Sequence, residues 1–269
     1  MTLQESYQSF AATSADLAGT CAESPQRFSD RSVERLLARR YNPRMIGHTK
    51  AADAWRTLGA TEPYFAVLTD ARFHRADQPG PAREGFFQSG EDDIAELFAR
   101  VALEHPDFAP RRALDFGCGV GLLLLPLARR VHDVVGADVS TTMLAEAQRN
   151  AAQARLGNVT LVVSDAAAYR QSGTFDLVHS CLVFQHIPRR AGMAILRDLV
   201  DRLNPGGVAA LHFVYAIRKP PWWRVGHWAR RTIPGAHGIA NLLRGRSVRR
   251  PLMQMNVASH GSCERARHE

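Results

Sequence analysis

Cysteine is scarce in this chain of 269 residues, and its four copies are widely separated. Cys21, Cys118, Cys181 and Cys263 include no C-x-x-C pair, so their spacing provides neither a zinc ligand set nor a disulfide framework. We therefore expect reduced thiols, as in a cytoplasmic protein, and no metal site built on cysteine.

Long hydrophobic runs are also missing. The longest aliphatic stretch, Leu122 to Leu125, is far shorter than the ~20 residues that a membrane-spanning helix needs. The first residues, Met1-Thr-Leu-Gln-Glu-Ser, have neither the basic start nor the apolar run of a signal peptide. These absences predict a cytoplasmic location, and the length is sufficient for one full-sized core with an additional cap.

Acidic residues are rare at the C-terminal end. Residues 216–269 contain eleven Arg or Lys and only two Glu, whereas residues 1–215 are nearly neutral. The net charge of +8 therefore lies in a basic tail, residues 216–269.

Short apolar runs alternate with helical patterns over residues 106–215, which is typical of a parallel α/β sheet. The runs predict strands at residues 112–116, 133–138, 159–163, 175–180 and 208–213. Ser140 is expected to cap the helix that follows the second strand, and Pro126 to disturb the helix that follows the first. The predicted fold is a Rossmann-like, doubly wound, mostly parallel sheet.

The region before this core divides into two parts. Residues 1–30 are polar and small and are predicted to be disordered, whereas residues 31–105 are predicted to form a helical cap. One helix is expected to begin at Ser89, with Asp92 three residues later as in a capping box. The cap is expected either to shape a pocket or only to cover the sheet.

A glycine-rich turn follows the first predicted strand. Gly117, Gly119 and Gly121 separate Asp115 from a leucine-rich helix, and glycine lets a backbone adopt positive φ and approach a ligand closely. A dinucleotide fingerprint, G-x-G-x-x-G, would need its third glycine at position 122, where leucine stands. The second strand ends in Asp138, a carboxylate placed to accept both hydroxyls of a ribose.

On these residues the chain resembles the class I S-adenosylmethionine-dependent methyltransferases of small-molecule type. Phe175–Ser180 and Asn204–Gly207 match later blocks of that family in order and spacing, so about 100 residues are covered. The resemblance implies S-adenosylmethionine as cofactor and a small-molecule acceptor that is methylated on O, N or C. Two alternatives are a non-catalytic S-adenosylmethionine-binding protein and an RNA or tRNA methyltransferase.

The resemblance also implies which residues contact the methionine part of the cofactor. Gly117, Gly119 and Gly121 would pass beneath it, Asp115 would lie near its ammonium group, and Ser180 would flank it.

Four further residues would contact the adenosine part. Asp138 would bind the ribose and Met143 would pack against the adenine, whose amino group and ring nitrogen would contact Asp165 and the Ala166 N–H. Taken singly, either aspartate is more typical of a turn or helix start, and Met143 of the core.

Methyl transfer from a sulfonium needs proximity and orientation, and a base only where the acceptor loses a proton. His186 is the candidate base, against the alternative that it only packs or hydrogen-bonds its loop. Metal-dependent relatives carry two glutamates just before this histidine, where Leu182 and Gln185 stand here, so no metal is expected. The Asn/Asp-Pro-Pro-Tyr motif is also absent after the fourth strand, which disfavours a nucleic-acid acceptor.

The basic tail departs from the family pattern, because its closing strands six and seven are not evident in the sequence. Trp222, Trp223 and Trp228 stand among arginines, a mixture that suits a lid over the acceptor, an anionic membrane surface or RNA. Frequent proline and glycine argue against one long helix there, and we therefore favour the lid over membrane or nucleic-acid contact.

Overall fold

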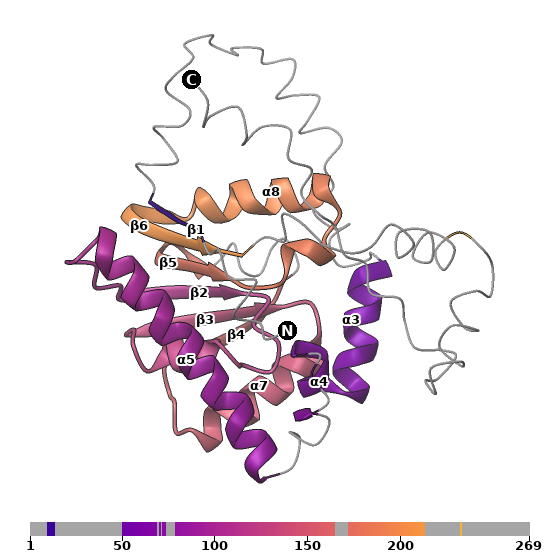
Figure 1. The fold of residues 1–269 in the computed structure, drawn as a ribbon. Coiled ribbons are helices and arrows are strands. Elements are labelled where there is room, and N and C mark those ends of the chain that lie inside the picture. The colour runs from indigo at the N-terminus through magenta and orange to yellow at the C-terminus, as the bar shows by residue number, and fades with distance from the viewer. Residues whose placement is uncertain are drawn as a thin grey trace, which may run out of the picture.

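The computed structural model describes residues 10–13, 50–68, 70, 72–73, 79–164, 172–212 and 232. They form one six-stranded sheet with the strand order β1-β6-β5-β2-β3-β4 (Figure 1). The strands are β1 (Phe10–Thr13), β2 (Arg112–Phe116), β3 (Asp133–Asp138), β4 (Val159–Val163), β5 (Phe175–Ser180) and β6 (Leu203–Leu211). β2 to β6 run parallel, and β1 lies antiparallel to β6 at the edge.

The predicted Rossmann-like α/β fold is confirmed, since all five expected strands are present and parallel. The last strand was expected at residues 208–213 but begins at Leu203, which pairs with Phe175. An irregularity in register accommodates the Asn-Pro-Gly-Gly turn, where Gly206 has φ 77°. β6 is the last strand among the described residues. Of the basic tail, residues 216–269, they include Thr232 alone.

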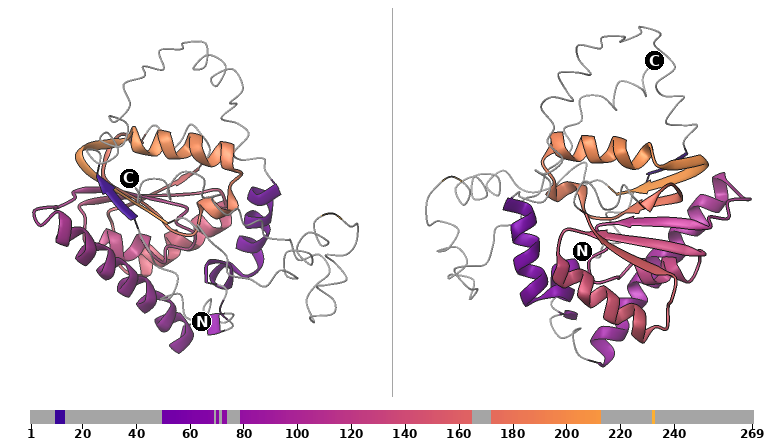
Figure 2. Two further views of the ribbon diagram at one scale, coloured as in Figure 1. Left: turned by 45° about the horizontal axis from the view of Figure 1, so that its top comes forward. Right: turned by 180° about the vertical axis from the view of Figure 1, so that it is seen from behind.

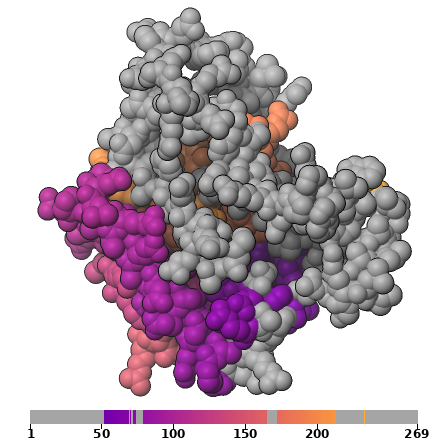
Figure 3. Space-filling model, viewed as in Figure 1, coloured from indigo at the N-terminus to yellow at the C-terminus, as the bar shows by residue number. Residues whose placement is uncertain are grey.

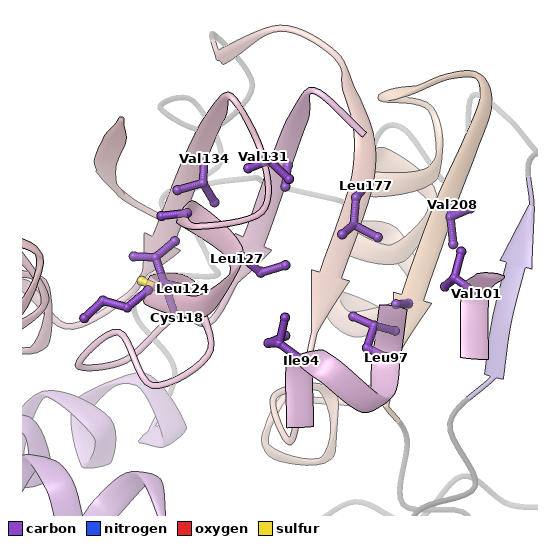
Figure 4. Packing of buried hydrophobic residues seen from close by; sticks show 14 of the residues in the cluster. Ile94, Leu97, Val101, Cys118, Leu124, Leu127, Val131, Val134, Leu177 and Val208 are labelled. Atoms are coloured by element: carbon purple, nitrogen blue, oxygen red, sulfur yellow. The ribbon is translucent and has the colours of Figure 1, made fainter. Parts of the chain in front are cut away.

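Helices cover both faces of the sheet (Figures 1 and 2). They are α3 (Lys50–Thr61), α4 (Pro63–Val67), α5 (Pro81–Glu104), α6 (Leu124–Ala128), α7 (Thr141–Gln153) and α8 (Arg189–Val200). On one face, Ile94 and Leu97 of α5 meet Leu177 and Val208 of the sheet (Figure 4). On the other face, α8 packs through its buried apolar side chains against β2 and β5. Figure 3 shows α5 at the molecular surface.

The helix that the sequence placed from Ser89 begins earlier, at Pro81. Gly80 is its N-cap residue. Proline fits the first turn because an N–H group there has no carbonyl partner within the helix, so no hydrogen bond is lost when proline lacks it. Ser89 lies inside this helix, and its hydroxyl donates to the Phe86 carbonyl at 2.7 Å instead of capping. The predicted N-cap at Ser89 is therefore wrong, whereas that at Ser140 is confirmed, since its hydroxyl accepts from the Met143 N–H.

Asp176 joins the starts of three neighbouring strands. Its carboxylate accepts from the backbone N–H groups of Arg111 and Arg112 at 2.9 and 3.0 Å, and from the Asn204 side chain at 2.8 Å. Burial alone would raise the pKa of Asp176, but these donors hold it below its usual value. Asp176 therefore has a structural role. It lies at the amino ends of these strands, away from the glycine turn.

The cap predicted over residues 31–105 contains the three described helices α3, α4 and α5, while residues 31–49 lie outside the described part. A separate apolar cluster joins the cap to the glycine turn, with Leu58, Tyr64 and Phe86 packed around Val120 and Met143. Of the stretch predicted to be disordered, residues 1–30, the structure describes β1 alone. The division of the chain into residues 1–30, 31–105, 106–215 and 216–269 remains a prediction.

Two glycines of α5 should respond in opposite ways to alanine. A methyl group at Gly90 would overlap the Leu122 carbonyl, so Gly90→Ala should destabilise the protein by roughly 1–3 kcal/mol. Gly85 has open space around it, and Gly85→Ala should stabilise by roughly 0.5–1 kcal/mol because alanine favours the helix. Denaturant unfolding measures both changes; equal effects would contradict the close packing of α5 on the turn.

Candidate active site

A cavity of about 140 Å³ opens at the carboxyl ends of the central strands. Its walls come from the glycine turn, the end of β3, the segment that follows β5, and the cap helices. We call it the larger cavity, because the second cavity beside it has a volume of about 40 Å³. Ligands of open α/β sheets bind at this edge, because strand ends and helix N-termini converge there.

The glycine turn is held to β3 by its backbone. The N–H groups of Gly117 and Cys118 both donate to the Ala137 carbonyl, at 2.6 and 3.1 Å. Gly117 has φ 84° and Gly119 φ 53°, conformations that a side chain disfavours, and both residues line the larger cavity. Gly121 packs instead against the neighbouring helices and so supports the turn from behind.

Asp138 lies at the end of β3 with both oxygens bonded to backbone. Oδ1 accepts from the Ser140 N–H at 2.8 Å and Oδ2 from the Gly119 N–H at 3.0 Å. Burial raises the pKa of this carboxyl to about 6, against the partly opposing effect of these donors. The carboxylate thus faces the cavity in a fixed orientation and is ionised at neutral pH.

Asp115 forms a buried pair with His179. The Nδ1 atom of His179 lies 2.8 Å from Oδ1 of Asp115, and the two residues are 7% and 2% exposed. The other carboxylate oxygen, Oδ2, is buried and has no hydrogen-bond partner among the described residues. Asp115 also lines the larger cavity, so this unused acceptor belongs to a residue of the cavity wall.

The other residues predicted to contact the cofactor differ in where they lie. Met143 is buried and lines the larger cavity, and Ser164 brings the end of β4 to the same wall. The Ser180 hydroxyl is buried and donates to the Phe116 carbonyl at 2.8 Å, which ties β5 to β2. Asp165 and Ala166 lie outside the described residues.

His186 lines the larger cavity. It ends η5 (Phe184–His186), a single helical turn after β5. Trp55 of α3 meets the imidazole edge-on, with ring centroids 5.1 Å apart, and Gln185 Nε2 lies 3.1 Å from His186 Nε2. The cap thus contacts the candidate base directly.

The sequence interpretation missed His179 and Trp55 as site residues. His179 could have been found from register, because parallel alignment of β2 and β5 places it opposite Asp115. Trp55 carries no such signal, since only the packing of α3 brings it to the cavity.

A smaller cavity adjoins the larger one and shares Asp93, Leu123 and Cys181 with it. It lies between α5 and the ends of β5 and β6, where His179 and His212 line it. Burial, together with the nearby His179, lowers the pKa of His212. The site thus offers a second compartment beside the glycine turn.

A buried polar network fastens the cap to the turn. The Tyr64 hydroxyl lies 2.5 Å from the Glu146 carboxylate and 3.1 Å from Asn150 Oδ1, and Arg83 also bonds to it. Asn150 in turn donates to the Val120 carbonyl of the turn at 2.8 Å. Burial, followed by the bond to Glu146, raises the pKa of Tyr64 to about 12, so the phenol stays protonated.

Comparison with known proteins gives a family match for the central part of the chain. Residues 113–207 match the family described as "Methyltransferase domain". These residues form a methyltransferase domain of the class I S-adenosylmethionine-dependent type, the family that the sequence resembled, and S-adenosylmethionine is the cofactor of that class.

Among curated relatives, a trans-aconitate 2-methyltransferase of Methylobacterium radiotolerans is 38% identical over 128 residues, 47% of this chain and 45% of the relative. A ubiquinone biosynthesis O-methyltransferase of Psychrobacter cryohalolentis is 36% identical over 165 residues, 60% and 58% of the two chains. The chain thus spans about half the length of these relatives. A solved structure, the magnesium protoporphyrin IX methyltransferase ChlM of Synechocystis PCC 6803 with bound SAH, overlaps with a TM-score of 0.43 at 23% identity, covering 65% of this chain and 79% of that one.

Two kinds of feature are absent from the described residues. No group of three or more His, Cys, Asp or Glu side chains there is placed to hold a metal ion. Within the same residues, no helix is both long and apolar enough to cross a bilayer.

The turn should not tolerate a side chain at Gly117. An alanine methyl there would overlap Val183 and would sit at φ 84°, so Gly117→Ala should cost roughly 1–3 kcal/mol of stability. Val183→Ala removes the overlap but leaves the backbone strain, so the double variant should recover part of that loss. Thermal unfolding of the three variants tests this; full additivity would show that the overlap with Val183 is not felt.

Proposed function

We propose that this protein transfers a methyl group from S-adenosylmethionine to a small-molecule acceptor. The observation that carries the proposal is the unpartnered, buried Oδ2 of Asp115, a residue that lines the same cavity as Asp138 and the glycine turn. An ammonium group would satisfy this oxygen, and the cofactor's methionine part carries one. The hydrogen-bond acceptors of the cavity wall therefore fit the cofactor.

The larger cavity would hold the cofactor along the glycine turn. The backbone of Gly117 and Gly119 would approach the methionine part, with its ammonium at Asp115. Asp138 would accept from the ribose hydroxyls, and Met143 would pack against the adenine. Asp165 and Ala166 are proposed to contact the adenine edge, and Ser180 to support the methionine end through its bond to Phe116.

The acceptor would enter from the side of the cap and be methylated on O, N or C. When bound, S-adenosylmethionine supplies a methyl group on a positively charged sulfur, which an acceptor atom attacks in line. Trp55 and η5 would orient the acceptor and exclude water, and His186 would take up a proton where the acceptor loses one. The two relatives described above are named for small molecules, trans-aconitate and ubiquinone, which supports this acceptor class.

Turnover tests the proposal directly. The protein, a radiolabelled methyl donor and a panel of carboxylic acids, phenols and amines should yield labelled product and S-adenosylhomocysteine for at least one class. A protein that binds the cofactor but methylates no member of a broad panel would favour a non-catalytic binding role. Labelling of RNA alone would favour the nucleic-acid alternative.

Cofactor affinity should depend on Asp138. Asp138→Ala removes a charged acceptor from the ribose, so S-adenosylhomocysteine should bind about tenfold more weakly or worse by calorimetry. Asp133→Ala is the matched control, because Asp133 lies exposed at the other end of β3. Unchanged affinity in a folded Asp138→Ala protein would refute the ribose contact.

The same affinity should depend on pH with a defined sign. The pKa of Asp138 is raised to about 6, so the carboxylate is ionised above that pH and neutral below it. Ribose hydroxyls donate to the ionised form, and therefore S-adenosylhomocysteine affinity should fall as pH drops through about 6. Asp138→Ala should lose this part of the pH dependence, and its retention would assign the titration to another group.

If His186 is a general base, His186→Asn should lower kcat and remove the acidic limb of the pH–rate profile. Binding of S-adenosylhomocysteine should change little, because the acceptor and not the cofactor needs the proton transfer. An unaltered profile would leave His186 with a packing role against Trp55.

A further inference from the structure

The pairing of Asp115 with His179 goes beyond what methyl transfer by itself requires. Asp115 and His179 are Cα partners on the parallel strands β2 and β5, so their side chains leave the same face of the sheet. His179 Nδ1 lies 2.8 Å from Asp115 Oδ1, and a carboxylate can only accept, so Nδ1 is the donor.

The pair decides which oxygen of Asp115 is left without a hydrogen-bond partner among the described residues. The terminal torsion of an aspartate is broad, so its own rotamer does not fix the plane of the carboxylate. A bond from His179 to Oδ1 fixes that plane and leaves Oδ2 as the unpartnered, buried oxygen. Asp115 lines the larger cavity, whereas His179 lines the smaller one, so the imidazole acts from outside the proposed cofactor pocket.

We propose that His179 is a positioning residue that orients Asp115 toward the ammonium group of the cofactor. This inference rests on the proposed function, because it takes the larger cavity as the cofactor site. His179 touches neither the cofactor nor the acceptor in this role. It makes the site selective for ligands with an ammonium group over nucleosides that lack one.

Two ligands separate this role from a general structural one. S-adenosylhomocysteine carries the ammonium group, whereas 5′-methylthioadenosine keeps the adenosine and sulfur and lacks the amino acid. His179→Leu should weaken S-adenosylhomocysteine about fivefold to tenfold, since a hydrogen bond to a charged group is worth about a decade in affinity. Its affinity for 5′-methylthioadenosine should stay within about twofold, because the adenosine contacts do not involve Asp115.

A double-mutant cycle tests whether the effect passes through Asp115. Asp115→Asn should itself weaken S-adenosylhomocysteine, and adding His179→Leu to it should then change little. His179→Asn keeps an N–H close to the position of Nδ1 and should restore much of the affinity. His132→Leu is the matched control, because His132 forms an equally short contact of 2.8 Å with Asp133 at an exposed position.

The outcomes distinguish the inference from the function on which it rests. Equal weakening of both ligands by His179→Leu, or full weakening in the Asp115→Asn background, would overturn the positioning role while cofactor binding stands. If the wild-type protein bound neither ligand, the cofactor site itself would be wrong and both proposals would fall. Should His179→Leu not fold, His179→Phe keeps a ring of similar volume, and the same two affinities decide.

Discussion

The backbone of the glycine turn is the constraint on which the rest of the site depends. Three parts of the molecule hold it: the Ala137 carbonyl of β3 accepts two of its N–H groups, Asn150 of α7 bonds to its Val120 carbonyl, and α5 approaches it at Gly90. On the side of the turn, each contact is made to main-chain atoms, so each one restrains the backbone of the turn itself. A turn held in this way offers its remaining backbone to a ligand with little reorganisation.

Two carboxylates are buried beside this turn, and they are stabilised differently. Asp138 has a backbone donor on each oxygen, yet burial still raises its pKa to about 6. Asp115 has His179 on one oxygen and no described partner on the other. Burying a carboxylate with incomplete hydrogen bonding costs stability, and a bound cation or hydroxyl recovers part of that cost. The arrangement therefore links the stability of the folded chain to occupancy of the proposed cofactor site.

The cap is attached to the turn by a polar network as well as by apolar packing. Tyr64 and Arg83 of the cap reach Asn150, whose side chain also bonds to the turn. The cap residue Trp55 contacts His186 at the other side of the cavity. Because helices of one cap reach both the turn and the candidate base, a shift of the whole cap would alter the two halves of the site together.

The sequence by itself determined the parallel strands, the N-cap of α7 at Ser140 and the part of the cavity wall that contains Asp138. Hydrophobic periodicity, glycine spacing and helix capping are local patterns, so the sequence displays them directly. The start of α5 at Pro81 follows another local pattern, glycine before proline, which the prediction of an N-cap at Ser89 did not use. The described tertiary structure alone decided the pairing of His179 with Asp115 and the approach of Trp55 to His186. These contacts depend on strand register and on how helices dock. The residues in each contact are 64 or more positions apart in the sequence, so no local sequence pattern indicates that they lie close together.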